Sequence, residues 1–255
     1  LEENHADTAM SYNNIGLICN NLGDYENALK YYLKALEIFE AVLDENLLNA
    51  AGSYDNIGLV LRKLGEHDKA LECHIKALEI FKDVLGEKHP ETASPYNNIG
   101  IVYLNLGDYD KALEYYIKAS EIFKEVLGEN NHRTAMSYDN IGAIYNNLGN
   151  YGKALEYHIK ASEIFENVVG ENHPDTAISY YGIGIVVSNL ENYEIALKYL
   201  IKAWEIFKEI LGESHPHTQQ TLQNISEAIQ KLEESQGKTE EPKKKKGFWS
   251  RLFGE

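Results

Sequence analysis

Histidine and cysteine are the residue types in this chain best suited to metal binding or nucleophilic catalysis. The sequence holds nine histidines and two cysteines. His89, His173 and His215 each precede a proline, and Cys19 and Cys73 are too far apart for the spacings of zinc sites. Helices packed side by side lie about 8–10 Å apart, and the ligands of one metal must be much closer. We therefore predict no metal site and no cofactor.

Other arrangements that support catalysis are also missing from the sequence. There is no glycine-rich phosphate loop, no Ser–His–Asp set on a plausible scaffold and no cysteine–histidine pairing. Aspartate and glutamate number 40 against 24 lysines and arginines, which gives a net charge of −16. This balance argues against nucleic acid, because phosphate binding needs clustered cations. The prediction is a chain that is neither an enzyme nor a nucleic-acid-binding protein.

The cellular setting is predicted from patterns that the sequence lacks. No apolar run reaches the roughly 18 residues needed to span a membrane, and no secretory signal pattern is present. Two cysteines are few for a disulfide framework and fit a reducing compartment. The expected location is cytoplasmic. The chain opens at Leu1 instead of methionine, which suggests a fragment or a processed chain.

The elements that position the side chains recur with a period of 42 residues. In the first period, apolar spacing predicts helices at about 8–22 and 25–43. Between them, Gly23 suits the left-handed end of one helix and Asp24 can cap the next. The blocks are 5–46, 47–88, 89–130, 131–172 and 173–214. A helix at about 216–234 is expected to cap the array, and 235–255 forms a linker and a tail.

One glycine of each block lies inside the first helix of the pair. These residues are Gly16, Gly58, Gly100, Gly142 and Gly184. Because glycine costs a helix about 1 kcal/mol relative to alanine, a close contact is expected there, with Gly16 meeting the face that carries Ala28. Block two begins Leu47-Leu48 instead of His-Pro, so an irregular linker is expected. Stacked pairs bury a continuous core, which predicts an all-α solenoid over 1–234.

The third block carries the residues that point to a family. It runs Tyr96-Asn97-Asn98-Ile99-Gly100, Tyr103, Leu106-Gly107-Asp108-Tyr109, Ala112, Tyr116 and Ala119. This pattern resembles the tetratricopeptide-repeat (TPR) motif, and the 42-residue length resembles the variety found in kinesin light chains. The resemblance extends from His5 to about Leu232. It implies a right-handed α-solenoid that serves as a scaffold or adaptor, with a partner peptide held on a concave surface lined by the first helices.

The resemblance also implies which side chains form the wall of this groove. The predicted peptide-binding residues are Asn13, Leu17, Asn20, Asn21, Asp55, Leu59, Arg62, Lys63, Asn97, Ile101, Leu104, Asn105, Asp139, Asn146 and Asn147. They share one helical stripe, opposite the core stripe. Apolar members would bury ligand side chains, and the amides would hold a peptide backbone. The alternative is that asparagine is simply common on this surface.

Two ligand modes of relatives are not predicted. The clamp for a C-terminal carboxylate needs asparagine where this chain has Leu17, Leu59 and Ile101. Only Arg62 and Lys63 supply positive charge in the stripe, which also argues against the aromatic and acidic cargo peptides of kinesin light chains. No long heptad segment for pairing with a motor heavy chain is present.

The C-terminal tail is basic and aromatic, unlike the rest of the chain. It contains Lys243, Lys244, Lys245, Lys246, Phe248, Trp249, Arg251 and Phe253. Three interpretations stay open: a flexible end without a specific role, a weak contact with anionic membrane, or a ligand for the chain's own groove. The function predicted first is therefore a non-catalytic protein–protein adaptor. The alternatives are a peripheral membrane scaffold and a module autoregulated by its tail.

Overall fold

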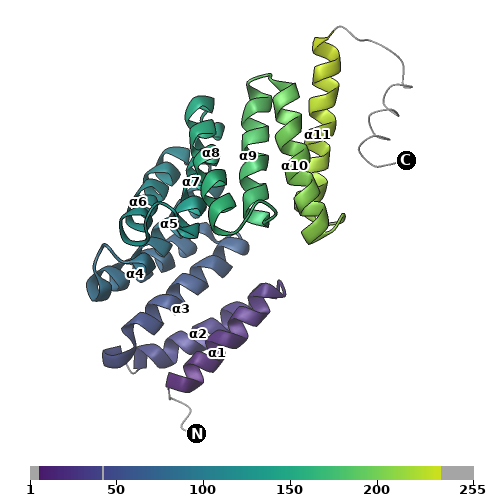
Figure 1. Ribbon diagram of the computed structural model, residues 1–255. Coiled ribbons are helices and arrows are strands. Elements are labelled where there is room, and N and C mark those ends of the chain that lie inside the picture. Colours follow the sequence, from purple (N-terminus) through teal and green to yellow (C-terminus); the bar gives the residue numbers. More distant parts are fainter. Residues whose placement is uncertain (1–5, 42, 237–255) are drawn as a thin grey trace. The chain divides into compact units, whose positions relative to one another are not determined.

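The computed structural model of the chain describes residues 6–41 and 43–236. This part of the chain contains eleven helices and no strand (Figure 1). They are α1 (Ala6–Asn21), α2 (Tyr25–Ala41), α3 (Leu43–Lys63), α4 (His67–Leu85), α5 (Pro90–Asn105), α6 (Tyr109–Leu127), α7 (His132–Asn147), α8 (Tyr151–Val168), α9 (Pro174–Asn189), α10 (Tyr193–Leu211) and α11 (Pro216–Ser235). The predicted all-α fold is confirmed, and the helix pairs follow the 42-residue period.

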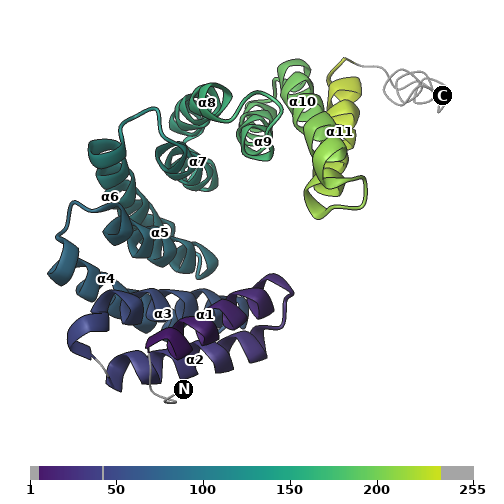
Figure 2. The same cartoon turned by 60° about the horizontal axis from the view of Figure 1, so that its bottom comes forward.

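The helices fall into two compact units, each described by itself. The N-terminal unit comprises residues 1–150 with α1–α7, and the C-terminal unit comprises residues 151–255 with α8–α11. Within each unit, every helix packs against the next one along the chain. We call α1, α3, α5, α7 and α9 the A helices and α2, α4, α6, α8 and α10 the B helices. In the N-terminal unit α1 also touches α3, and α3 touches α5, so neighbouring A helices lie side by side (Figure 2).

The glycines inside α1, α3, α5 and α9 each allow a large side chain of the following B helix to approach. A Cβ atom added at Gly16 would lie 2.8 Å from the ring of Tyr32, and one at Gly184 would lie 2.7 Å from Leu200. Sequence analysis expected this contact on the face that carries Ala28. The face is right, but the residue that fills the space is Tyr32, one helical turn further on.

The loops between repeats are held by two recurring hydrogen bonds. The Nδ1 atom of His89 accepts from the backbone N–H of Glu91 at 3.2 Å and so caps α5. The hydroxyl of Thr92 donates to the carbonyl oxygen of Gly86 at 2.8 Å. The same pair of bonds is made by Asn131 and Thr134, by His173 and Thr176, and by His215 and Thr218. The linker histidines therefore serve as helix caps.

Block two lacks both bonds, since Leu47 and Ala50 stand where the cap and the threonine would be. Helix α3 accordingly begins early, at Leu43, and runs through Asn46, whose backbone (φ −127°, ψ 17°) leaves the helical region. The irregular linker expected from the sequence is confirmed as a kink at Asn46.

The turn between α9 and α10 carries a glutamate where the other A–B turns carry glycine. Glu191 has φ 61°, close to the φ of 76° at Gly107 in the turn between α5 and α6. A left-handed backbone costs a residue with a Cβ about 1 kcal/mol. We expect Glu191→Gly to raise the free energy of unfolding by about 1 kcal/mol, measured by urea denaturation. Glu191→Gln keeps the backbone penalty and should change little. A loss of stability in Glu191→Gly would contradict the argument.

Candidate functional site

The predicted groove residues lie on the A helices of the N-terminal unit. Four come from each of α1, α3 and α5, and three come from α7. Because α1 touches α3 and α3 touches α5, neighbouring rows of these residues share one face of the unit. Leu17 is 49% exposed, Ile101 is half-buried, and Asn105 and Asn147 are exposed. Asp139 differs from the others, because it is buried.

Several of these polar side chains are tied to the next repeat by a ladder of hydrogen bonds. The Nδ2 atom of Asn98 donates to both carboxylate oxygens of Asp55, at 3.1 and 2.9 Å. Asn140 donates in the same way to the Oδ1 atom of Asn97, at 3.0 Å. Asn13 makes its bond to Ser53, at 3.0 Å. The polar residues of this face therefore join A helices to one another as well as facing outward.

The C-terminal unit has an equivalent rung with a different residue. The hydroxyl of Tyr181, which stands where earlier repeats have Asn97 or Asp55, accepts from Asn224 at 2.8 Å. Burial raises the pKa of Tyr181 above that of a free tyrosine. Block five thus has a bulkier residue at this position, and its partner Asn224 is the equivalent of Asn98 and Asn140.

Asp55 also holds a buried histidine. The Nδ1 atom of His74 lies 2.6 Å from a carboxylate oxygen of Asp55, and the His74 side chain is fully buried. Its ring packs on Gly58, where an added Cβ atom would lie 2.6 Å away. The Nε2 atom of His74 is buried without a hydrogen-bond partner among the described residues. His74 lies on α4, a B helix, so this bond joins the two helices of one repeat.

A signal for this pairing is present in the repeats themselves. The residue at the sequence position of His74 changes together with the residue at the sequence position of Asp55. The pairs are Asn13 with Tyr32, Asp55 with His74, Asn97 with Tyr116, Asp139 with His158, and Tyr181 with Leu200. Aspartate occurs only where the partner is histidine. Comparing the blocks for pairs of positions that change together would have revealed the pairing of Asp55 with His74.

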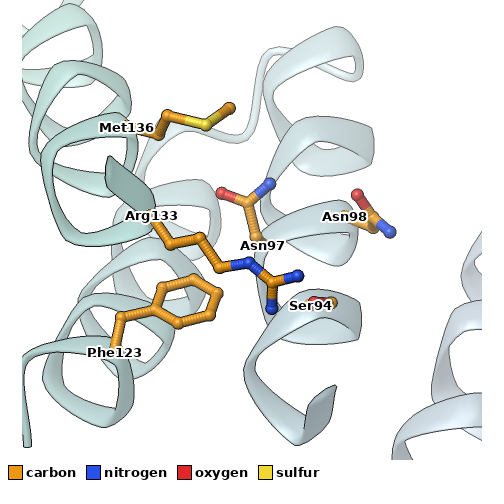
Figure 3. Close-up of a pocket in the computed structure, with 6 residues that line it drawn as sticks. All are labelled: Ser94, Asn97, Asn98, Phe123, Arg133 and Met136. Atoms are coloured by element: carbon orange, nitrogen blue, oxygen red, sulfur yellow. The ribbon is translucent and has the colours of Figure 1, made fainter. Parts of the chain in front are cut away.

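One recess opens on the face of the N-terminal unit that carries the predicted groove residues of α1, α3, α5 and α7, called the A-helix face below. It is a cavity of about 270 Å³ lined by Ser94, Asn97, Asn98, Phe123, Arg133 and Met136, shown in Figure 3. Asn97 belongs to the predicted groove. Arg133 does not, because it lies in the first turn of α7, before the stripe of groove positions begins.

Two other hollows lie beside B helices, and several of their charged groups have partners within the protein. In one, the Nζ atom of Lys88 lies 2.5 Å from a carboxylate oxygen of Glu125. In the other, Tyr54 donates to Glu40, and burial together with this bond raises the pKa of Tyr54 to about 12. These hollows offer a ligand fewer unsatisfied polar groups than the recess on the A-helix face.

Exposed apolar side chains do not by themselves locate a site in this chain. Leu17 and Leu33 are each 49% exposed, although one lies on an A helix and the other on a B helix. Leu22 and its equivalents at the A–B turns are also exposed. The A-helix face differs because its apolar side chains adjoin a recess and amide groups.

The remaining predictions concern metals, membranes and the tail. No group of three histidine, cysteine, aspartate or glutamate residues that could hold a metal ion occurs within residues 6–41 and 43–236. None of the helices described is long and apolar enough to cross a membrane. The tail residues, Lys243 to Phe253, lie outside the described residues.

Comparison with family profiles decides which family the chain belongs to. Profiles of the tetratricopeptide repeat match residues 7–59, 49–125, 91–146, 133–194 and 176–217. The chain is a TPR protein. Proteins built from these repeats bind protein or peptide partners, so this chain is a protein-interaction repeat module of a typically non-catalytic fold. Curated protein sequences gave no significant match.

Solved structures with this TPR fold include kinesin-light-chain-like proteins. BtubC (BKLC) from P. vanneervenii is 24% identical with a TM-score of 0.71, over 83% of this chain and 84% of that one. Nearly identical TPR-like repeats from Podosopora anserina, described as those of a kinesin light chain, are 16% identical with a TM-score of 0.67, over 82% and 98%. RapI in its apo form is 24% identical with a TM-score of 0.69, over 86% and 81%. At these identities the likeness concerns the fold.

Proposed function

We propose that this TPR protein is an adaptor that binds a segment of a partner protein on the A-helix face of its N-terminal unit. The groove residues named above form the wall of this binding surface. We further propose that residues 1–234 form one array of five repeats and a capping helix. The observation that carries it is the recess between α5 and α7, where amide, hydroxyl and apolar side chains meet at the surface.

The composition of this face supports binding of a peptide. Leu17 and Met136 are 49% and 45% exposed. A ligand that packs against them would remove apolar surface from water, which favours binding. Asparagine amides such as Asn105 can pair with the backbone of an extended segment, which combines affinity with little dependence on sequence. Asp55 contributes mainly structure, since its carboxylate is engaged by His74 and Asn98.

The chain offers a closely matched pair of variants for the test. Peptides selected on the intact protein from a displayed random library are the probe, and anisotropy of labelled peptide is the readout. Leu17→Asp/Met136→Asp changes two exposed residues of the A helices, and Leu33→Asp/Val126→Asp changes two of the B helices with 49% and 42% exposure. We expect the first variant to lose at least about tenfold in affinity, and the second to bind as the parent does.

Both variants gain the same two negative charges, so general electrostatics cannot separate them. Equal circular dichroism spectra would establish that both are folded. If the B-helix variant loses binding and the A-helix variant retains it, the site lies on the other face and the proposal is wrong. It is also wrong if no peptide can be selected.

A further inference from the structure

The recess on the A-helix face contains an arginine that helix stability does not explain. Arg133 lies in the first turn of α7, where the helix dipole favours negative charge. The equivalent residues of the other blocks are Asp7, Asn49, Glu91, Asp175 and His217. Three of these five residues are acidic, which suits a helix N-terminus, whereas the positive charge of Arg133 does not. Such a departure from a local rule is expected where a residue serves binding.

The guanidinium of Arg133 is held by contact with an aromatic ring, and its charge is not balanced by an ion pair among the described residues. It lies over the ring of Phe123, 5.9 Å from the ring centroid, and the side chain is exposed. Figure 3 shows it between Phe123 and the side chains of α5. No carboxylate among the described residues forms an ion pair with it. Stacking on the ring restricts its motion without using its hydrogen-bond donors.

The neighbouring amide presents a donor to the same recess. Because Asn140 donates to the Oδ1 atom of Asn97 at 3.0 Å, the other half of the Asn97 amide, its Nδ2 donor, is left for a ligand. The hydroxyl of Ser94 adds another possible donor. Asn98 also lines the recess, but its Nδ2 atom is directed to Asp55 on α3. The available donors thus surround a space whose lining includes no carboxylate.

We propose that this recess binds the side-chain carboxylate of a single acidic residue in a partner peptide, with an adjacent apolar residue on Met136. The inference rests on the proposed function and names its ligand. Arg133 supplies the charge, and Asn97 and Ser94 supply further hydrogen bonds, a combination that favours a carboxylate. A cavity of about 270 Å³ has room for one or two side chains.

A side chain fits better than a C-terminal carboxylate because the face continues on both sides of the recess. Leu59 on α3 and Asn146 on α7 are half-buried and accessible, so a peptide can extend in either direction. The net charge of −16 disfavours a run of acidic residues. Charges beyond about 8–10 Å are screened at physiological salt. The distant negative charges of the chain therefore do little to weaken the attraction between Arg133 and one carboxylate in direct contact with it.

The test uses end-blocked peptide libraries with one fixed central residue, glutamate or glutamine, and degenerate flanks. Each library is incubated with the immobilised full chain, and the retained peptides are quantified. We expect about a tenfold preference for the glutamate library, lost in Arg133→Gln. Lys30→Gln removes one exposed positive charge on α2 and should keep the preference. Arg133→Glu should prefer a third library, centred on lysine.

Each outcome bears on the recess or on the whole face. Equal retention of the glutamate and glutamine libraries, or a preference that survives Arg133→Gln, overturns the recess alone and leaves the adaptor function standing. Retention only of peptides with a free C-terminal carboxylate, tested as a separate arm, overturns the side-chain assignment. If neither library is retained by the intact chain, the recess and the adaptor proposal both fail.

Discussion

Replacement of Asp55 by alanine is expected to lower the free energy of unfolding by about 3 kcal/mol. The substitution removes the acceptor of His74, 2.6 Å away, and that of Asn98, at 2.9 and 3.1 Å. His74 is fully buried and its Nε2 atom already has no partner among the described residues, so both ring nitrogens would be left unpaired. Urea denaturation of the full chain, followed by circular dichroism, measures the loss.

A double-mutant cycle separates this pair from general disruption. Asn13 with Tyr32 and Asn97 with Tyr116 occupy the equivalent positions in blocks one and three, so Asp55→Asn/His74→Tyr recreates a pairing that the fold already uses. We expect the double variant to be more stable than the sum of the single losses predicts, by about 1 kcal/mol. Strictly additive losses would show that the two residues are not coupled.

The second large effect is expected from one added methyl group. In Gly58→Ala the new Cβ atom would lie 2.6 Å from the ring of His74. Asp55 holds that ring, and the His74 side chain is fully buried. The ring therefore has no room to move away from the new methyl group. Overpacking of this kind costs about 2 kcal/mol. A lower urea midpoint, with helix content unchanged in the absence of denaturant, is the expected observation.

Helix α3 contains its own control. Gly52 lies six residues before Gly58 in the same helix, and nothing lies within 4 Å of an added Cβ atom there. Gly52→Ala should raise the free energy of unfolding by about 0.5–1 kcal/mol, because alanine is the better helix former. If both alanine variants shift stability in the same direction, the close approach of His74 does not determine the effect.

The hydrogen-bond ladder affects how the binding face should be mutated. Asn97 was predicted from the sequence as a ligand-binding residue, yet its Oδ1 atom accepts from Asn140 of the next repeat. Asn97→Ala would therefore disturb repeat stacking as well as ligand contact. Leu17 and Met136 make cleaner targets, since they are about half exposed and their exposed surface contributes little to the core.

The sequence determined the repeat, its length and the helices, because these depend on local patterns. Apolar spacing, the turn glycines such as Gly23 and the His-Pro caps each act within a few residues of themselves, and the structure has helices where these patterns predict them. The missing cap at Leu47 likewise predicted an irregular start to block two, observed as the kink at Asn46.

Only the tertiary structure decided which side chains meet across helices. Periodicity places Gly16 and Ala28 on facing surfaces, but the depth of the approach depends on the size of Tyr32. The bond from Asn98 to Asp55 and the recess that joins Arg133 to Asn97 link residues about one repeat apart, through the angle at which neighbouring pairs pack. That angle arises from the sum of many contacts, and a one-dimensional pattern does not contain it.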